Sequence, residues 1–297
     1  MPVWYFGPKS GQIATSRLEH THCEMVRAMI IARALLPVIT AVLFLTRGGP
    51  AASAGELDRV DARFEIFGFA GFHVLTNRTT IQESGDRYAI AMDLDTRGLA
   101  SVFVDLTSHS QVHGKLASEA ARPEAYRSDV RRNGADRHYE INYRVDGTVS
   151  KASVPSATGQ QLWLAAEQTR GTVDQLTAYY LVEHQLARGG GCALVVLVFD
   201  GSGLYNLRFT DLKRETLSAD RYQNFSGPSQ VCKVEREDVV VNPDRNEDTY
   251  RTGRIWYALA GDRMMPVRME YDTAFGIVKG YLAELRGPGV SLHLVKE

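Results

Sequence analysis

The segment HYEINYRV, residues 138–145, decides the fold class because its polar and apolar side chains alternate one by one. Tyr139, Ile141, Tyr143 and Val145 stand at every second position, and polar side chains occupy the positions between them. A period of two residues is typical of a β-strand with one face on a core and the other face in water. The segment therefore predicts a half-buried strand of an antiparallel sheet.

The same alternation recurs along the chain from residue 55 onward. Further examples lie at 88–94, 204–211, 255–259, 267–271 and 277–285. Turn signals rich in Gly, Asp and Asn separate the segments, at 84–86, 133–134, 146–147, 200–201, 261–262 and 287–289. Strands do not alternate regularly with helices, and no linker of domain size interrupts the pattern. We therefore predict one mainly β domain whose long sheet curls into a half-barrel or a β-spiral.

One strand differs from the others in its composition. The segment CALVVLVF, residues 192–199, is almost entirely apolar and shows no alternation. Such a run is typical of a strand that is covered on both faces. We expect other elements on both sides of it.

The segment 173–188 breaks the β pattern and predicts the principal helix. Thr172 and Gln175 have the spacing of a capping box, and Arg188 followed by three glycines makes a basic last turn and a stop. The middle of the segment, 178–182, is apolar on nearly all sides, so the helix has to be surrounded by other elements. The full prediction is a long curved antiparallel sheet wrapped around one helix, which lies in or across its concave side.

Aromatic side chains are concentrated in the predicted strands and helix, on or beside apolar positions. We expect Leu176, Tyr179 and Tyr180 of the helix, and Trp256 of a strand, to pack between the helix and the concave face. Ordinary core packing accounts for most such side chains. A curled sheet of this size also has room for a partly open apolar cavity that takes a hydrophobic ligand, and both interpretations stay open.

The first 54 residues predict export. Arg27 and Arg33 precede the apolar run 34–45, and Ala-Ser-Ala at 52–54 supplies the small residues of a cleavage site. The apolar run is shorter than the ~20 residues that a membrane-spanning helix needs. The alternative is an uncleaved N-terminal anchor. The predicted organisation is an upstream extension from a misplaced start at 1–24, a signal peptide at 25–54 that is cleaved after Ala54, and a single β-rich domain at 55–297.

The chain has three cysteines, and two of them follow the predicted cleavage site. Cys23 lies before it, whereas Cys192 and Cys232 remain as an even pair in an oxidising compartment. We predict a disulfide between Cys192 and Cys232. The alternative is a pair of buried free thiols.

The common catalytic signatures are missing from the sequence, which has no nucleophile elbow, phosphate-binding loop, dinucleotide fingerprint or zinc-protease motif. His109 and His113 stand four residues apart without a third ligand at metal-binding spacing. Asp93, Asp95 and Asp105 fit the wet faces of strands better than a glycosidase pair. The net charge of −1, without a long basic run, argues against a nucleic-acid partner. We expect no enzyme activity, no metal and no cofactor.

Several separated stretches resemble, in the same order, a bacterial envelope family catalogued as domain-of-unknown-function family 3108. They are RFEIFG at 63–68, RYAI at 87–90, GTVDQLTA at 171–178, VFDGSGLYNL at 198–207, MPVRME at 265–270 and FGIVKGYL at 275–282. The likeness covers most of residues 59–286. The family's helix typically starts with Asp-Pro-Leu-Ser, whereas this chain has Asp-Gln-Leu-Thr at 174–177, a departure that does not move the helix.

The resemblance implies a Gram-negative, periplasmic protein with a long curved sheet around a helix. More remotely, such a protein looks like the half-barrel carriers of lipoproteins and the β-spiral envelope-integrity proteins. It brings no catalytic residue to this chain. The expected function is to bind or carry a hydrophobic envelope ligand, such as a lipid or a segment of an envelope lipoprotein. The alternatives are a structural or interaction protein for envelope integrity with a filled core, and an enzyme that acts on glycan.

Overall fold

The computed structural model describes residues 58–68, 71–98, 105–117, 120–153, 164–201, 203–241, 252–273 and 276–295. The chain divides into a unit at Met1–Gly49, which lies outside the described residues, and a unit at Pro50–Glu297. The predicted extension at 1–24 and signal peptide at 25–54 also lie outside them. Within the described residues, no helix is long and apolar enough to cross a membrane.

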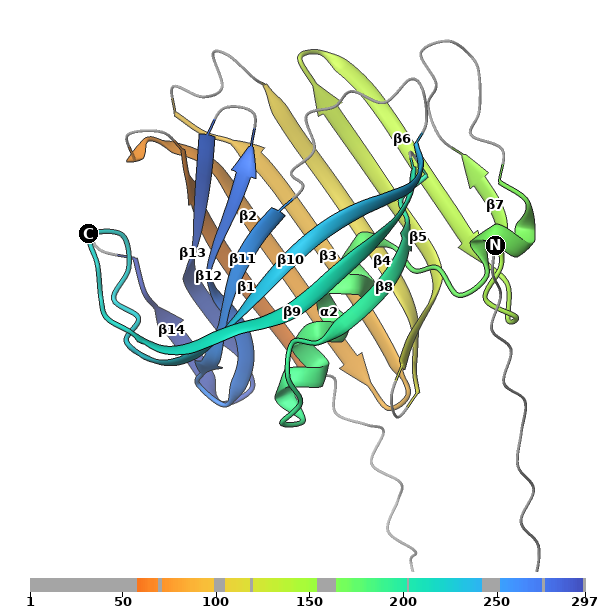
Figure 1. Ribbon diagram of the computed structural model, residues 1–297. Helices are drawn as coiled ribbons and strands as arrows, with labels where there is room; N and C mark the ends of the chain where they lie inside the picture. The colour runs from red at the N-terminus through yellow and green to blue at the C-terminus, as the bar shows by residue number, and fades with distance from the viewer. Residues whose placement is uncertain are drawn as a thin grey trace, which may run out of the picture. The chain divides into compact units, whose positions relative to one another are not determined.

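A single curved sheet of 14 strands, each antiparallel to its neighbours, makes up most of the second unit (Figure 1). The predicted sheet wrapped around one helix is thereby confirmed. The strands are β1 Asp58–Phe67, β2 His73–Ser84, β3 Arg87–Thr96, β4 Leu106–Ala117, β5 Ala120–Arg132, β6 Ala135–Tyr143, β7 Val149–Ser153, β8 Leu194–Phe199, β9 Gly203–Leu217, β10 Gly227–Val241, β11 Thr252–Ala260, β12 Arg263–Thr273, β13 Gly276–Gly287 and β14 Val290–His293. The 3-10 helix η2 Ala166–Thr169 and the α-helix α2 Gln175–Ala187 connect β7 to β8.

The strand order joins two meanders. It runs β7-β6-β5-β4-β3-β2-β1-β13-β12-β11-β10-β9-β8, and β14 pairs with β13 beside this path. Two-residue turns link β2 to β3, β5 to β6 and β11 to β12, and the turn between β5 and β6 has Asn133 and Gly134 at φ values of 51° and 77°. Asn-Gly suits that turn because both residues tolerate positive φ. The two meanders meet where β1 pairs with β13, from Asp61 opposite Arg286 to Phe67 opposite Lys279.

The two ends of the sheet, β7 and β8, approach each other through side chains and not through a hydrogen-bonded ladder in the described part of the chain. Ile141 of β6 packs in one buried cluster with Phe199 and Leu204 of the β8–β9 hairpin. The connector before α2 covers the β8 edge, since Val173 pairs with Val198 in a parallel bridge. Covering an edge in this way hides backbone groups that would otherwise pair with another chain.

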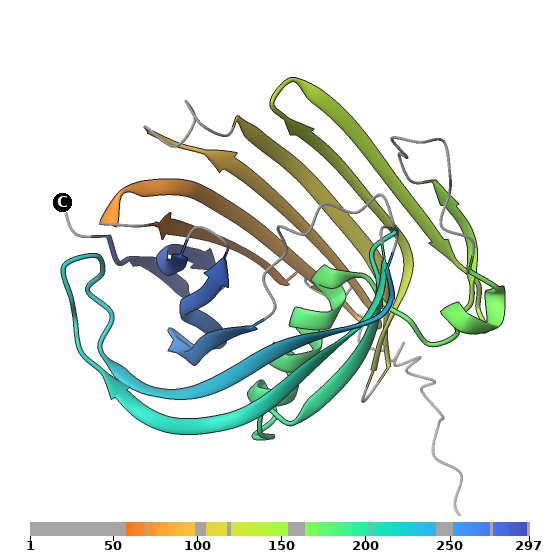
Figure 2. The same cartoon turned by 45° about the horizontal axis from the view of Figure 1, so that its top comes forward.

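Helix α2 lies inside the curve of the sheet, as the view in Figure 2 shows. It begins two residues later than expected, because Asp174 and not a Thr172–Gln175 box caps it. The Asp174 side chain accepts a hydrogen bond from the Thr177 N–H, whereas the Thr172 hydroxyl donates to the Thr169 carbonyl. The predicted stop is found after Ala187, where Gly189 has a φ of 80°.

Two buried clusters hold α2 to opposite sides of the curve. On one side Ala178, Val182 and Leu186 pack against strands β8–β11. On the other side Tyr180 packs against strands β2–β4 and the start of β5. The helix therefore ties the two meanders together across the concave face, as its all-round apolar centre predicts.

The expectation for β8 is only partly met. Val196 and Val198 are buried on the side of α2, but the Val195 side chain on the other face is 50% exposed. The outer face of β8 is therefore not covered by a second layer of protein at Val195. The apolar composition of the strand did not indicate this.

A second core, which includes Trp256, Val267 and Leu282, lies where β12 and β13 diverge. Strands β12 and β13 pair only between Arg268 opposite Tyr281 and Thr273 opposite Gly276 among the described residues. Beyond that ladder the buried Gln223 amide donates to the carbonyls of Val267, at 3.1 Å, and Leu282, at 3.0 Å. One side chain thus satisfies a carbonyl from each of the two diverging strands.

Candidate functional site

A cavity of about 170 Å³ lies between α2 and the concave face of the sheet. Its lining includes members of both clusters that hold the helix, such as Tyr257 and Tyr180. Its lining is mainly apolar and comes from α2 and five strands: Phe64, Asn77, Thr79, Ile81, Ile90, Met92, Leu176, Tyr179, Tyr180, Glu183, Ile255, Tyr257, Met265, Pro266, Met269 and Tyr271.

Stacked aromatic rings fix the side of α2 that faces β3. Tyr180 and Tyr88 stack with their ring centroids 5.3 Å apart. The Tyr88 hydroxyl lies 2.8 Å from the Thr177 hydroxyl, which donates to the buried Asp174 carboxylate at 2.6 Å. The cap of the helix and one wall of the cavity therefore belong to one hydrogen-bonded chain. Burial raises the pKa of Asp174, whereas the hydrogen bonds that its carboxylate accepts lower it, and burial has the larger effect.

Glu183 is the one ionisable carboxylate among the lining residues. It is 8% exposed, and its Oε1 lies 3.6 Å from the Arg263 Nε. Arg263 also binds Glu83 at 2.8 Å and lies 3.6 Å from Asp58. Burial raises the pKa of Glu183 to about 7, although the Arg263 guanidinium acts in the opposite direction. One guanidinium thus faces three carboxylates at the edge of an apolar cavity.

Two polar atoms at the cavity wall are buried without a hydrogen bond to any described residue. They are the Tyr180 hydroxyl and the Oε1 of Glu183. Buried polar atoms are nearly always paired, because leaving one unpaired costs about 1–3 kcal/mol. Both atoms belong to residues one turn apart on α2. They mark the polar end of an otherwise apolar space.

Three of the four residues expected at the concave face are brought together in the cavity lining, and one is not. Leu176, Tyr179 and Tyr180 line it, and the Tyr179 ring also packs edge-on against Phe209. Trp256 lies instead in the second core and donates from its indole N–H to Glu215. Its neighbours in the sequence, Ile255 and Tyr257, are the ones that line the cavity.

Sequence reasoning missed Glu183, although a signal for it exists. Its position is three residues after Tyr180, four after Tyr179 and seven after Leu176. Residues at those spacings share one face of a helix. A carboxylate on the same face as three residues expected to be buried is the pattern that indicates a polar group inside a core. Arg263 directly follows the turn at 261–262, and nothing in its sequence position indicates that it pairs with a buried carboxylate.

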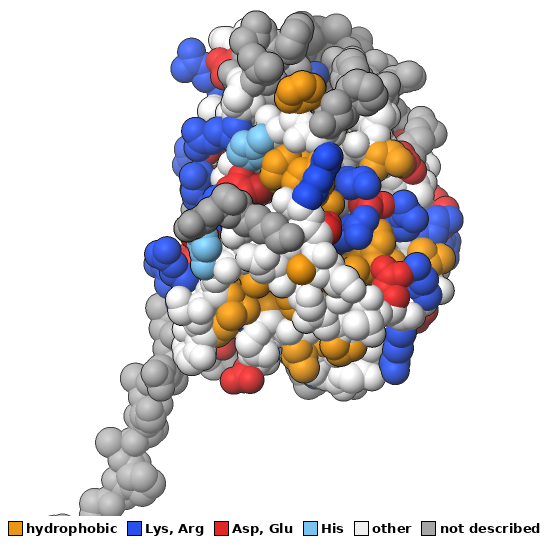
Figure 3. Space-filling model, turned by 90° about the vertical axis from the view of Figure 1, so that its left-hand side faces the viewer, with side chains coloured by type: hydrophobic (Ala, Val, Ile, Leu, Met, Phe, Trp, Pro, Cys, Tyr) orange, Lys and Arg blue, Asp and Glu red, His pale blue; other side chains and the backbone are white. Residues whose placement is uncertain are grey.

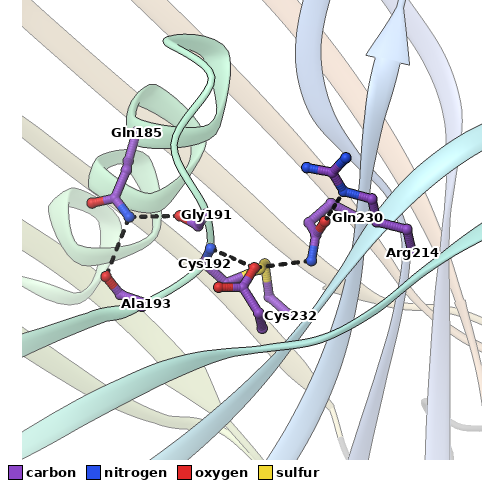
Figure 4. Close-up of a disulfide and its surroundings, with 8 residues drawn as sticks. Gln185, Gly191, Cys192, Ala193, Arg214, Gln230 and Cys232 are labelled. Atoms are coloured by element: carbon purple, nitrogen blue, oxygen red, sulfur yellow. Dashed lines mark hydrogen bonds between the residues drawn. A yellow bond between two sulfur atoms is a disulfide. The ribbon is translucent and has the colours of Figure 1, made fainter.

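The predicted disulfide joins Cys192 and Cys232, both fully buried, with their Cα atoms 5.6 Å apart (Figure 4). It ties the end of the α2–β8 connection to β10. Asp211 accepts from the Cys192 N–H and from the Gln230 amide, both at 2.9 Å. The Gln185 amide of α2 donates to the carbonyls of Gly191 and Ala193. The connection between the helix and the sheet is therefore held by a covalent bond and by a polar network around it.

The histidines and aspartates of strands β3–β6 lie on the face opposite to α2, beside a hollow of about 430 Å³. The His109 Nδ1 lies 2.7 Å from an Asp93 carboxylate oxygen, and the His138 Nδ1 lies 2.6 Å from one of Asp129. These side chains are about half exposed, and exposed ion pairs stabilise little. His113 is paired across the sheet with Ala89 and Ala125, away from His109.

Two of the acidic residues considered for glycan chemistry pair with neighbouring basic side chains. Asp95 binds Arg78 at 3.1 Å and Arg97 at 3.4 Å, while Asp93 binds His109. Within the described ranges, no group of three or more His, Cys, Asp or Glu side chains is placed to hold a metal ion. On the side of the molecule drawn in Figure 3, hydrophobic side chains show as small groups among charged and polar ones. The cavity beneath α2 is thus the feature that best fits a binding site.

Comparison with known proteins adds a family and a similar fold. Residues 63–283 match the model of a family described as "Protein of unknown function (DUF3108)". No curated protein matches the chain significantly. The crystal structure of a beta-barrel-like protein of the domain of unknown function DUF1849 from Brucella abortus is similar, with a TM-score of 0.46 and 12% sequence identity. The match covers 77% of this chain and 98% of that chain.

Proposed function

The chain belongs to the DUF3108 family, and we propose that it is a periplasmic, non-enzymatic protein that binds an apolar part of an envelope molecule in the cavity beneath α2. The observation that carries the proposal is the cavity itself. Sixteen side chains from α2 and five strands surround it, and most of them are apolar. An apolar space closed by a helix takes hydrophobic groups because their transfer from water is favourable.

The size of the cavity limits what it holds. Typical small-molecule sites measure about 300–1,000 Å³, whereas this one measures about 170 Å³. It suits part of one acyl chain, or one apolar side chain, and not a whole lipid. The remainder of a lipid or of a lipoprotein segment would lie outside the cavity.

Export is the second part of the proposal. It rests on the N-terminal pattern at 25–54 and is supported by the buried Cys192–Cys232 disulfide, since such bonds persist in oxidising compartments. We expect the protein recovered from the periplasm to begin at Gly55. N-terminal sequencing that finds Met1 or Met25 on the folded protein would contradict this.

A cavity-filling variant tests ligand binding. Met92→Trp places a larger side chain in the lining from β3, and we expect it to abolish binding of a fluorescent fatty-acid probe while costing about 1–3 kcal/mol of stability. Ile277→Trp is the matched control, because Ile277 is 47% exposed and lies outside the lining. Solvent extraction and mass spectrometry of protein from the periplasm should find an alkyl-chain compound in the wild type and less of it in Met92→Trp.

The result of this test also distinguishes a ligand-binding protein from a structural protein with a filled core. A wild type that carries no extracted lipid and binds no probe would leave the filled-core interpretation, in which the protein acts through surface contacts. Equal probe binding by the wild type and Met92→Trp would place the ligand elsewhere on the molecule. Either result overturns the proposed site.

A further inference from the structure

The polar end of the cavity narrows the class of ligand, and this inference rests on the proposed function. Glu183 stands two helical turns after Leu176, which places the two side chains about 10 Å apart along the axis of α2. Side chains of β1, β2, β3, β11 and β12 line the rest of the space, and most of them are apolar; Asn77 and Thr79 of β2 are the polar exceptions besides the tyrosine hydroxyls. The cavity therefore has one charged end and a mainly apolar body.

The charges around that end favour a donor and disfavour an anion. Glu183, Glu83 and Asp58 all face the Arg263 guanidinium, at 3.6, 2.8 and 3.6 Å. With every carboxylate ionised the group carries an excess of negative charge. A second anion brought to Glu183 would meet like charges in a buried place, where repulsion is strong.

Two buried polar atoms at this end also favour a head group that donates hydrogen bonds. The Oε1 of Glu183 is a carboxylate oxygen, which only accepts when ionised, and the Tyr180 hydroxyl both donates and accepts. Within the described residues neither atom makes a hydrogen bond of normal length, and the nearest donor to the Glu183 Oε1 is the Arg263 Nε, at 3.6 Å. A ligand head group that donates hydrogen bonds would satisfy Glu183 and could pair with Tyr180 as well.

We propose that Glu183 is the anchor of this cavity and that its ligand is a single-chain amphiphile with an amine or hydroxyl head group, not a carboxylate or phosphate. The apolar body takes the chain, and Glu183 accepts hydrogen bonds from the head. An ammonium head also compensates the excess negative charge. No covalent step is involved.

Proton release gives this proposal a second signature. The charged and titratable groups around Glu183 are Arg263 of β12, Glu83 of β2, Asp58 of β1, and Tyr180 and His184 of α2. Burial raises the pKa of Glu183 to about 7, so a part of the empty protein holds a proton there at neutral pH. An ammonium ion favours the ionised carboxylate, and its binding at pH 7 should release that proton.

The test compares three ligands that differ only in the head group. Octylamine, octan-1-ol and octanoate are titrated into the full mature protein by calorimetry at pH 7, in two buffers of different ionisation enthalpy. We expect octylamine and octan-1-ol to bind at least tenfold more tightly than octanoate. We also expect the binding heat of octylamine, but not of octan-1-ol, to depend on the buffer because a proton is released.

A variant assigns the selectivity to one side chain. Glu183→Gln should weaken octylamine binding at least tenfold, remove its proton release and leave octan-1-ol binding nearly unchanged. Glu167→Gln is the control, since Glu167 is 75% exposed on η2 and should change nothing. If Glu183→Gln does not fold, the wild-type comparison of the three head groups decides alone.

The outcomes separate this inference from the proposed function. Binding of all three compounds with similar affinity would overturn the anchor and leave the apolar cavity standing. Tighter binding of octanoate would reverse the charge assignment and overturn the anchor as well. Failure of every compound to bind, with no lipid extracted from the native protein, would overturn the proposed function and the anchor with it.

Discussion

Glu183 makes the stability of the protein depend on pH in an unusual direction. Buried carboxylates in ion pairs commonly have lowered pKa values, but burial raises the pKa of this one from 4.5 to about 7. The folded state therefore holds the proton more tightly than the unfolded state does. Stability from this group is complete below pH 4.5, where both states are protonated, and is lost as the pH rises toward 7.

We expect the free energy of unfolding of the wild type, relative to Glu183→Gln, to fall by about 3 kcal/mol between pH 4.5 and pH 8. Urea unfolding of both proteins at pH 4.5, 6 and 8 measures this difference. The comparison with the variant removes the contributions of other groups, which both proteins share. Parallel pH profiles of the two proteins would contradict the raised pKa.

The stacked tyrosines give a second residue-scale prediction, because their hydroxyls differ. The Tyr88 hydroxyl pairs with Thr177 at 2.8 Å, whereas that of Tyr180 has no hydrogen bond to a described residue. Tyr88→Phe should cost about 1 kcal/mol or more, since it removes a buried hydrogen bond. Tyr180→Phe should cost less than Tyr88→Phe, because the Tyr180 hydroxyl makes no hydrogen bond of normal length and only comes near the Glu83 carboxylate. Urea unfolding of the two variants, each of which lacks one tyrosine hydroxyl, measures the two losses of stability. An equal loss in both variants would contradict the prediction.

At the scale of elements, the start of α2 depends on a side chain that the sequence pattern did not single out. Asp174 is fully buried and accepts from the N–H and the hydroxyl of Thr177, at 3.0 and 2.6 Å. Asp174→Ala should therefore cost about 2 kcal/mol or more, at the upper end of the range for helix caps. Thr172→Val should cost about 1 kcal/mol or less, because the Thr172 hydroxyl donates to Thr169 outside the helix. Urea unfolding measures both losses. A larger loss from Thr172→Val than from Asp174→Ala would support the Thr172–Gln175 capping box instead.

How far the sequence predicts these elements depends on the range of the interaction that forms them. Alternation predicts strands such as β6 because the pattern is local, and the stop after Ala187 is likewise local. The partner of a strand is not local. Nothing in β1 indicates that it pairs with β13, more than 200 residues later, and nothing in β8 indicates an edge. Leu176, Tyr179 and Tyr180 lie on α2 and line the cavity, because a helical face follows from spacing. Trp256 alternates with Ile255 and Tyr257 along β11 and packs in another buried cluster. Which of the two faces of the strand meets α2 depends on long-range pairing, which the segment does not fix.

At the scale of the whole molecule, the disulfide joins positions 40 residues apart. Closing a loop of that length restricts the unfolded chain by about 4 kcal/mol on the entropic account. We expect Cys192→Ser with Cys232→Ser to lose about 2–5 kcal/mol in urea unfolding. Unreduced wild-type protein from the periplasm should show no alkylatable thiol. Two reactive thiols in the native protein would contradict the bond.

The pairing of β1 with β13 also decides when the sheet is completed. Hairpins within each meander close short loops, but the join between the meanders closes a loop of more than 200 residues. Non-local ladders form slowly, since their loop entropy has to be lost before their contacts compensate it. The two meanders are therefore expected to form first and the β1–β13 seam last, with α2 drawn between them. Until the C-terminal strands are made, β1 presents an unpaired edge, so a chain that ends before β13 offers that edge to a strand of another chain and is prone to associate.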